Sequence, residues 1–183
     1  MDRRADIARA GIRLIAAGGT HALTHRQVDR EAGLPAGSTS YYARTRRDLV
    51  RLVCEQLSLD GMDEAGAQVI PQHLSVEKAT DMVVALMETM AGRREAQAAR
   101  FALMFEVRDD PELRAQLTSG AQVRLDLEAL ACDLLQAIGV RDADRAAPTF
   151  VATMDALLMY QAVEAAPIDM RDAVHAYLKG LCD

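Results

Sequence analysis

The chain has 183 residues, of which 50% are hydrophobic and 26% are charged, and its net charge at pH 7 is −6. This length allows one large domain, or a small domain joined to a larger one, with a core that needs no metal or disulfide. The three cysteines, Cys54, Cys132 and Cys182, are widely spaced, which argues against a disulfide framework and fits a reduced cytoplasm. No apolar run reaches membrane-spanning length, so we expect a cytoplasmic protein that does not bind a membrane.

The sequence predicts an all-α fold of about nine helices, because alanine and leucine are frequent and no alternating strand pattern occurs. Apolar residues at helical spacing predict a first helix over 3–17. Thr24 and Gln27 form a capping box at the start of a second helix, which a glycine ends. A third, short helix is expected over 36–42, with Pro35 at a first helical position.

The remaining helices are expected to be longer. Thr45 and Asp48 form a second capping box, which opens a helix that continues towards residue 70. Glycine and proline residues and an Asp-Asp-Pro sequence then mark the breaks between five further segments of helical pattern. These segments cover approximately residues 75–91, 94–107, 111–138, 142–165 and 169–181.

Charge is distributed unevenly along the chain. Residues 1–50 contain nine arginines and five acidic residues, a balance of +4, whereas residues 51–183 contain 12 basic and 22 acidic residues, a balance of −10. A basic N-terminal region on an acidic body is typical of a protein that brings one end to a polyanion such as DNA. Chance clustering of arginines is the alternative, and charge alone does not decide between the two.

Two short helices behind a longer one form a helix-turn-helix, whose second helix enters the major groove of DNA. The segment 36–42 reads Ala-Gly-Ser-Thr-Ser-Tyr-Tyr and begins with residues that are poor helix formers and bury little area. Small side chains allow close approach to another surface, and hydroxyl groups donate hydrogen bonds to phosphates or base edges. We therefore interpret this segment as a DNA recognition helix.

Arg46 and Arg47 are expected in the first turn of the next helix, where the helix macrodipole disfavours cations. Two arginines beside free backbone N–H groups form an anion site, and Arg44 lies close by. We interpret this group as a phosphate contact. The alternative is a solvated basic surface.

The stretch from Leu23 to Leu49, LTHRQVDREAGLPAGSTSYYARTRRDL, resembles the DNA-binding region of the TetR family of repressors. The shared pattern is a capping Thr, an Ala-Gly turn, a Gly in the recognition helix, a Tyr pair, then a basic residue and a capping Ser or Thr before Leu. The resemblance implies phosphate contacts from the cap, the Tyr pair and an arginine, and groove contacts from residues 35–40. The expected DNA-binding residues are Thr24, His25, Pro35, Ala36, Gly37, Ser38, Thr39, Ser40, Tyr41, Tyr42, Arg44 and Arg46.

A dimer is expected, because a single helix-turn-helix makes too few contacts for tight specific binding. The helix over 142–165 is apolar on two faces, one for its own core and the other for a symmetry mate. The last helix completes a four-helix interface in TetR-like proteins, and full burial within one monomer is the alternative. The expected interface residues are Ala152, Ala156, Met159, Val163, Val174, Tyr177 and Leu178.

Methionine and phenylalanine recur at helical spacing between residues 75 and 107. Flexible, polarizable thioethers suit a pocket for varied apolar compounds, although an ordinary core is the alternative for any single methionine. The expected ligand-binding residues are Met82, Leu86, Met90, Phe101, Met104, Phe105, Met154 and Gln161.

The four histidines are scattered, and the sequence has no nucleophile elbow, phosphate loop or metal cluster, so we expect neither an enzyme nor a cofactor. A helix-turn-helix DNA-binding domain is expected over 1–48, and a helical ligand-sensing and dimerisation domain over 49–183. The expected function is that of a ligand-responsive repressor, released from a palindromic operator in double-stranded DNA by a small apolar molecule. The alternative is a helical protein-interaction module without sequence-specific DNA binding.

Overall fold

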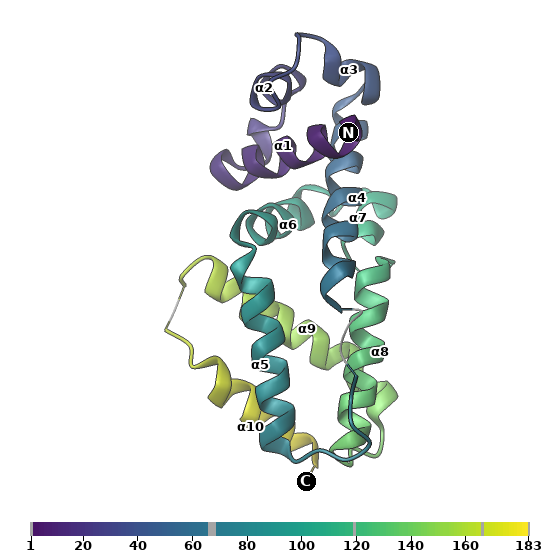
Figure 1. Cartoon of the computed structure of the whole chain (residues 1–183), viewed down its shortest axis with the longest axis vertical. Coiled ribbons are helices and arrows are strands. Elements are labelled where there is room, and N and C mark those ends of the chain that lie inside the picture. The colour runs from purple at the N-terminus through teal and green to yellow at the C-terminus, as the bar shows by residue number, and fades with distance from the viewer. Residues whose placement is uncertain (1, 66–68, 119, 166, 183) are drawn as a thin grey trace. The chain divides into compact units, whose positions relative to one another are not determined.

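The structure, a computed structural model, describes residues 2–65, 69–118, 120–165 and 167–182. All regular elements in these ranges are helical (Figure 1), with ten α-helices and one short 3-10 helix. The predicted all-α fold is confirmed. In the described part of the chain, none of the helices has the length and apolar character that crossing a membrane requires.

The chain divides into two compact units, Met1–Asp63 with Glu95–Val123, and Glu64–Arg94 with Arg124–Asp183. The first unit holds α1 (Arg3–Gly18), η1 (Thr20–Ala22), α2 (His25–Glu31), α3 (Ser38–Tyr42), α4 (Arg46–Ala65) except its last two residues, α6 (Arg94–Glu106) except its first residue, and α7 (Pro111–Leu117). The second holds α5 (Val76–Gly92), α8 (Gln122–Ala137), α9 (Ala143–Ala162) and α10 (Met170–Cys182). These units reflect contacts within the chain, and the functional division after residue 48 stays a prediction.

Local capping interactions explain where several helices begin. The hydroxyl of Thr24 accepts a hydrogen bond from the backbone N–H of Gln27 at 3.3 Å, at the start of α2. At the start of α4, the Asp48 carboxylate accepts from the backbone N–H and the hydroxyl of Thr45, and the Thr45 hydroxyl accepts from the N–H of Asp48. Both predicted helix starts are therefore confirmed.

The core of the first unit is built from aliphatic residues of α1, α2, α4, α6 and α7. Helices α1 and α4 come close at Gly11, because a Cβ there would lie 2.6 Å from Cγ2 of Val53. Burial of these apolar faces supplies most of the driving force for folding. The fully buried members include Ile7, Leu23, Val28, Leu49, Val53 and Leu103.

In the second unit, α5 packs against both α9 and α10, and Figure 1 shows α10 running alongside α5. Val174 and Leu178 of α10 and Thr80 of α5 are completely buried. The loop before α5 is joined to the end of α8 by a hydrogen bond from the Leu74 N–H to the Ala137 carbonyl, at 3.0 Å.

The single helix predicted over 111–138 was wrong, because the structure has α7 and α8 there, separated by residues 118–121. Thr118, Ser119 and Gly120 are poor helix formers in succession, and Thr118 has left the helical conformation with φ −131° and ψ −131°. The helix expected to continue towards residue 70 is described as α4 as far as Ala65, and residues 66–68 lie outside the described residues.

Candidate DNA-binding surface and ligand pocket

The recognition helix α3 begins at Ser38, later than the expected 36–42. Gly37 precedes it with φ +90°, a left-handed conformation that costs glycine nothing and other residues a great deal. Pro35 therefore lies outside the helix, and its prediction as a first helical residue was wrong. Its carbonyl instead accepts hydrogen bonds from the N–H of Ser38 at 3.1 Å and from the Ser38 hydroxyl at 2.7 Å.

A buried carboxylate from α2 holds the start of α3. Asp29 is only 4% exposed, and its two oxygens accept hydrogen bonds from the N–H of Gly37, the N–H of Thr39 and the hydroxyl of Thr39, at 2.6–2.7 Å. Burial disfavours the charged form of Asp29, but the hydrogen bonds from Thr39 and Gly37 outweigh it and lower the pKa below its usual value. The carboxylate thus satisfies backbone donors that a helix start leaves unpaired.

Most of the residues expected to contact DNA lie at the surface, but not all of them. Thr39 is completely buried with its hydroxyl donated to Asp29, so its side chain is not available to DNA. His25 is half-buried, and its Nε2 lies 2.8 Å from the carbonyl oxygen of Ala43. Tyr41 is 82% exposed and meets the ring of Tyr42 edge to face. The exposed members of the expected set are Thr24, Pro35, Ala36, Gly37, Ser40, Tyr41, Arg44 and Arg46, with Ser38 and Tyr42 half-buried.

Arg46 ties three elements of the first unit together. Its Nη1 donates to the carbonyl of Leu23 at 2.7 Å, and its Nη2 donates to the carbonyl of Thr20 and to Glu106, both at 2.9 Å. Glu106 also accepts from the Thr20 hydroxyl, and its hydrogen bond with Arg46 lowers its pKa below the usual value. A DNA contact from Arg46 stays a prediction, since the position of this arginine has an explanation within the protein.

Arg47 also has acidic partners within the first unit. Its guanidinium bonds Asp110 and Glu112, each at a shortest distance of 2.6 Å. These bonds raise the pKa of Arg47 and lower the pKa of both carboxyl groups. The sequence suggested that Arg46 and Arg47 occupy an unfavourable end of the helix dipole because they bind a phosphate. In the structure both arginines instead bind carboxylates of the same unit, which the sequence did not reveal.

The nine arginines of the N-terminal region differ in whether they pair with a carboxylate. Arg3, Arg4, Arg9, Arg13, Arg46 and Arg47 each lie within 4.0 Å of a carboxylate oxygen. Arg26, Arg30 and Arg44 are exposed and pair with no carboxylate among the residues described. All three belong to the helix-turn-helix or follow it directly, so this surface keeps its positive charge. Sequence reasoning found Arg44 but missed Arg26 and Arg30, which the four-residue spacing on α2 places on one face.

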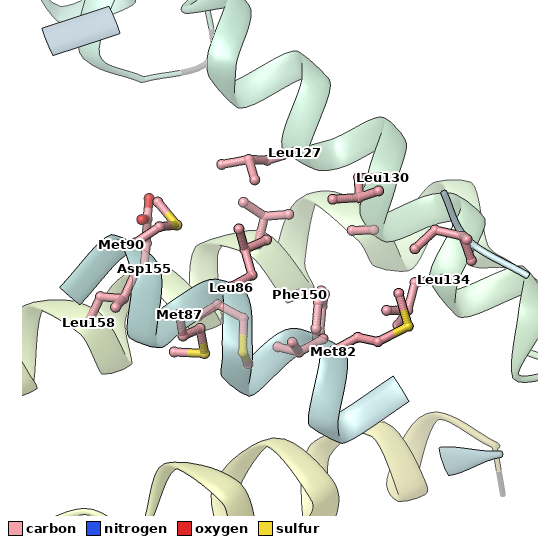
Figure 2. Close-up of a pocket in the computed structure, with 15 residues that line it drawn as sticks. Met82, Leu86, Met87, Met90, Leu127, Leu130, Leu134, Phe150, Asp155 and Leu158 are labelled. Carbon is pink, nitrogen blue, oxygen red and sulfur yellow. The ribbon is translucent and has the colours of Figure 1, made fainter. Parts of the chain in front are cut away.

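The second unit contains a pocket of about 60 Å³ between α5, α8 and α9. Figure 2 shows the α5 side chains, among them Met82 and Leu86, facing Leu127 and Leu130 of α8 across the pocket. Almost the entire wall is apolar, which suits an apolar ligand. The lining residues are Ile70, Met82, Val83, Leu86, Met87, Met90, Leu127, Leu130, Ala131, Leu134, Phe150, Val151, Met154, Asp155 and Leu158.

Four of the expected ligand-binding residues, Met82, Leu86, Met90 and Met154, line this pocket. Four others do not. Phe101, Met104 and Phe105 belong to α6 in the first unit, where Met104 packs against the core and Phe105 is 69% exposed. Gln161 is exposed on α9.

The pocket residues of α8 were not predicted from the sequence. Leu127, Leu130 and Leu134 recur at spacings of three and four residues, which places them on one face of the helix and is the pattern that could have indicated them.

One carboxylate, Asp155, stands among the lining residues. Its Oδ2 lies 3.5 Å from Nη1 of Arg124, which also binds Glu128 and donates to the carbonyl of Pro148 at 2.8 Å. Asp155 is thus part of an ion-pair network that links α8 to α9, at the edge of an otherwise apolar wall.

Helix α9 has a buried apolar face and, over its second half and the residue that follows it, a row of exposed apolar side chains. Met154 and Leu158 face the pocket, whereas Ala152, Ala156, Tyr160 and Val163 are exposed and follow one another at spacings of three or four residues. Two of the expected interface residues do not belong to such a surface. Val174 and Leu178 are completely buried within the monomer, because α10 turns its apolar face towards α5. Tyr177 and Met159 are half-buried, and the Tyr177 ring lies 5.7 Å from that of Phe150.

A helix-turn-helix is a motif that docks on DNA, and in this chain a helical unit with an apolar pocket accompanies it. The family model described as "Tetracyclin repressor-like, C-terminal domain" matches residues 74–183, more than half of the chain. The chain therefore belongs to the TetR family, whose members are transcriptional regulators and not enzymes. The resemblance found in the sequence is confirmed.

Solved structures of similar fold extend over nearly the whole chain. A TetR-family member from Streptomyces coelicolor A3 is 23% identical, covers 99% of this chain and 98% of its own, and has a TM-score of 0.71. The multidrug binding protein EbrR complexed with ethidium is 23% identical with 98% coverage of both chains and a TM-score of 0.75. Salmonella enterica GusR is 17% identical, covers 98% of this chain and 94% of its own, and has a TM-score of 0.71. At these identities the likeness establishes the fold, and no curated protein matches the sequence.

Proposed function

We propose that the chain is a homodimeric repressor that binds a palindromic operator through residues 1–48 and senses a small apolar molecule through residues 49–183. The observation that carries this proposal is the set of three exposed arginines, Arg26, Arg30 and Arg44, which keep no carboxylate partner among the described residues. A folded protein surface gains little stability from unpaired like charges, whereas a phosphate backbone attracts them. Around them lie the small and hydroxyl side chains of the segment 35–41.

The residues of the proposed DNA surface are chosen by the exposure of their side chains. It retains Thr24, Pro35, Ala36, Gly37, Ser40 and Tyr41 together with Arg44, adds Arg26 and Arg30, and omits the buried Thr39. In a helix-turn-helix the first helix crosses the phosphate backbone while the N-terminal part of the second faces base edges. We therefore assign phosphate contacts to the arginines and groove contacts to the residues around Ser40.

The proposed effector site is the apolar pocket between α5, α8 and α9. A pocket of about 60 Å³ is smaller than sites for small molecules, which are commonly about 300–1,000 Å³, so binding must open it. The unbranched side chains of Met82, Met87, Met90 and Met154 can change rotamer at little cost, which supports such opening. That EbrR, a protein of similar fold, was solved with ethidium supports a small-molecule effector here.

Release from DNA requires an effector that prefers one arrangement of the dimer over the other. Half-sites in a palindrome are about 34–36 Å apart, so two recognition helices bind together only at the matching separation. We propose that opening the pocket favours a dimer with a different separation. Ala152 and Ala156, exposed on α9, and Val163, exposed directly after it, support a dimer formed through this helix.

The experiment that tests the proposal is selection of duplexes from a random-sequence pool by the purified protein. We expect an enriched palindrome and an affinity that falls steeply with salt. Small molecules found by thermal shift should then release the enriched duplex. An Ala131→Leu variant, which fills the pocket, should bind the duplex but no longer respond to those molecules.

Failure to enrich any sequence, with no retention on DNA and behaviour that does not change with salt, would refute the repressor and favour the protein-interaction module. Molecules that stabilise the protein without altering DNA binding would refute the proposed release. Retained duplex binding by Ala131→Leu, with loss of the response to these molecules, would assign the response to the pocket.

A further inference from the structure

The recognition helix α3 is held by α2 at both of its ends. Asp29 and His25 are four residues apart on α2 and therefore share one face of that helix. Asp29 binds the residues at the start of α3, and His25 binds the residue that follows its end. Two polar side chains of α2 thus form hydrogen bonds at both ends of α3.

At the start of α3, the Asp29 carboxylate takes the place of a capping side chain. One oxygen accepts from the N–H of Gly37 at 2.7 Å, and the other accepts from the N–H and the hydroxyl of Thr39 at 2.7 and 2.6 Å. Three short hydrogen bonds to a charged acceptor are the strong kind, and they depend on angle as well as distance. They fix the rotation of α3 about its axis as well as its distance from α2.

At the end of α3, His25 Nε2 lies 2.8 Å from the carbonyl oxygen of Ala43. A carbonyl oxygen only accepts, so Nε2 carries the proton and donates it. Ala43 is 1% exposed, and its own N–H donates to the carbonyl of Thr39 at 2.9 Å. The same residue therefore closes the helix and receives the bond from α2.

The helix needs such support because its own interactions are few. α3 has only five residues, Ser38–Tyr42, and short helices are unstable in isolation. Thr39 is its only buried residue, and that residue is polar. Apolar packing of α3 is confined to Tyr42, which is half-buried against the core, and to Ala43 directly after the helix, so the start of α3 depends on the hydrogen bonds from α2.

We infer that His25 and Asp29 form a polar clamp that sets the orientation of the recognition helix and thereby the sequence specificity of DNA binding. The inference rests on the proposed function, because specificity has meaning only if α3 enters a groove. Base contacts are directional and a tilt of the helix disrupts them, whereas phosphate contacts from flexible arginines tolerate it. His25 and Asp29 are positioning residues and do not themselves need to touch DNA.

The test compares Asp29→Asn with the matched variant Asp48→Asn. An amide at Asp29 keeps the size of the carboxylate but turns one acceptor oxygen into a donor that faces an N–H of Gly37 or Thr39. Asp48 also binds a hydroxyl and a backbone N–H, but it caps α4 and takes no part in the clamp. Thr39→Val and His25→Phe remove single bonds at either end of α3.

Two measurements separate orientation from simple loss of folding. The first is the ratio of affinities for the duplex that the wild type selects and for a scrambled duplex of equal length. For Asp29→Asn we expect this ratio to fall at least about tenfold, the lower end of the effect of losing a charged hydrogen bond, with scrambled-duplex affinity within about twofold of wild type. Thr39→Val and His25→Phe should lower the ratio by less, and Asp48→Asn should leave it unchanged.

The second measurement is hydrogen exchange of residues 37–43 without DNA, where Asp29→Asn should lose protection and Asp48→Asn should not. An unchanged ratio in Asp29→Asn, or an equal fall in Asp48→Asn, overturns the inference. So does equal loss of both duplexes, which indicates a smaller folded fraction; if Asp29→Asn does not fold, Thr39→Val decides by the same criteria. If the wild type selects no duplex, the proposed function and the role in specificity are both refuted. The hydrogen-exchange data still test whether Asp29 holds residues 37–43 in place.

Discussion

Removal of one unpaired arginine should change how DNA binding depends on salt. Arg44 is exposed between α3 and α4 and pairs with no carboxylate among the described residues, so in the proposed complex it neutralises a phosphate. Binding then releases a counterion for each such contact, which makes affinity fall as salt rises. We predict that Arg44→Gln binds more weakly at low salt and responds less to added salt.

The size of the effect follows from the symmetry of the proposed dimer. Each phosphate contact contributes about −0.9 to the slope of log affinity against log salt, and a dimer carries two copies of Arg44, so the slope should flatten by about 1.8. Between 50 and 200 mM salt, a fourfold change, the variant should then lose about twelvefold less affinity than the wild type. An effect of this size is readily measured by fluorescence anisotropy with a labelled duplex.

The control is Arg13→Gln, which removes the same charge from the same N-terminal region. Nε of Arg13 lies 2.6 Å from Glu31, so this arginine is engaged within the protein. Its slope should match that of the wild type. Equal flattening in both variants would mean that only total charge matters, and no flattening in Arg44→Gln would show that Arg44 contacts no phosphate; either result refutes the reasoning.

Three further predictions address stability, assembly and pH. Arg46→Gln should lower the free energy of unfolding by about 1 kcal/mol in urea titrations, because the carbonyls of Thr20 and Leu23 lose their donor; the stability of Arg44→Gln should not change. Ala156→Glu should convert the dimer to a monomer in sedimentation experiments, because the exposed face of α9 would then place like charges together. The folded-state pKa of Asp29 is depressed, so its contribution to stability is present above the usual pKa of 3.8 and is lost as the pH falls through the lower folded value. The stability difference between wild type and Asp29→Asn should therefore be constant from about pH 5 to 7 and shrink below about pH 4.

The parts of the fold that depend on neighbouring residues could be predicted from the sequence. The capping boxes at Thr24 and Thr45 marked the starts of α2 and α4, because a helix start needs acceptors within three residues. The start of α3 could not be found in this way. Its acceptor is Asp29, which precedes it by eight to ten residues and belongs to another helix. Pro35 was expected at the first helical position because proline lacks an N–H that would need a partner there, but α3 begins at Ser38.

Burial explains why part of the candidate interface was misplaced. The apolar stripe of α10 was visible in the sequence, but a stripe does not say which surface covers it. Val174 and Leu178 are covered by their own chain, whereas Ala152 and Ala156 on α9 are left exposed. The sequence could identify the apolar faces, and only the packing of α10 on α5 separates the internal face from the exposed one.

Folding also changes which arginines of the N-terminal region can attract DNA. The balance of +4 over residues 1–50 treats all nine arginines alike. Carboxylates from distant parts of the chain, such as Glu55 and Glu106, engage several of them and cancel their charge locally. What remains for a polyanion is the set of arginines in and just after the helix-turn-helix. Local cancellation confines the attraction for DNA to the surface that carries the recognition helix, so that non-specific attraction and specific recognition favour the same orientation of the protein.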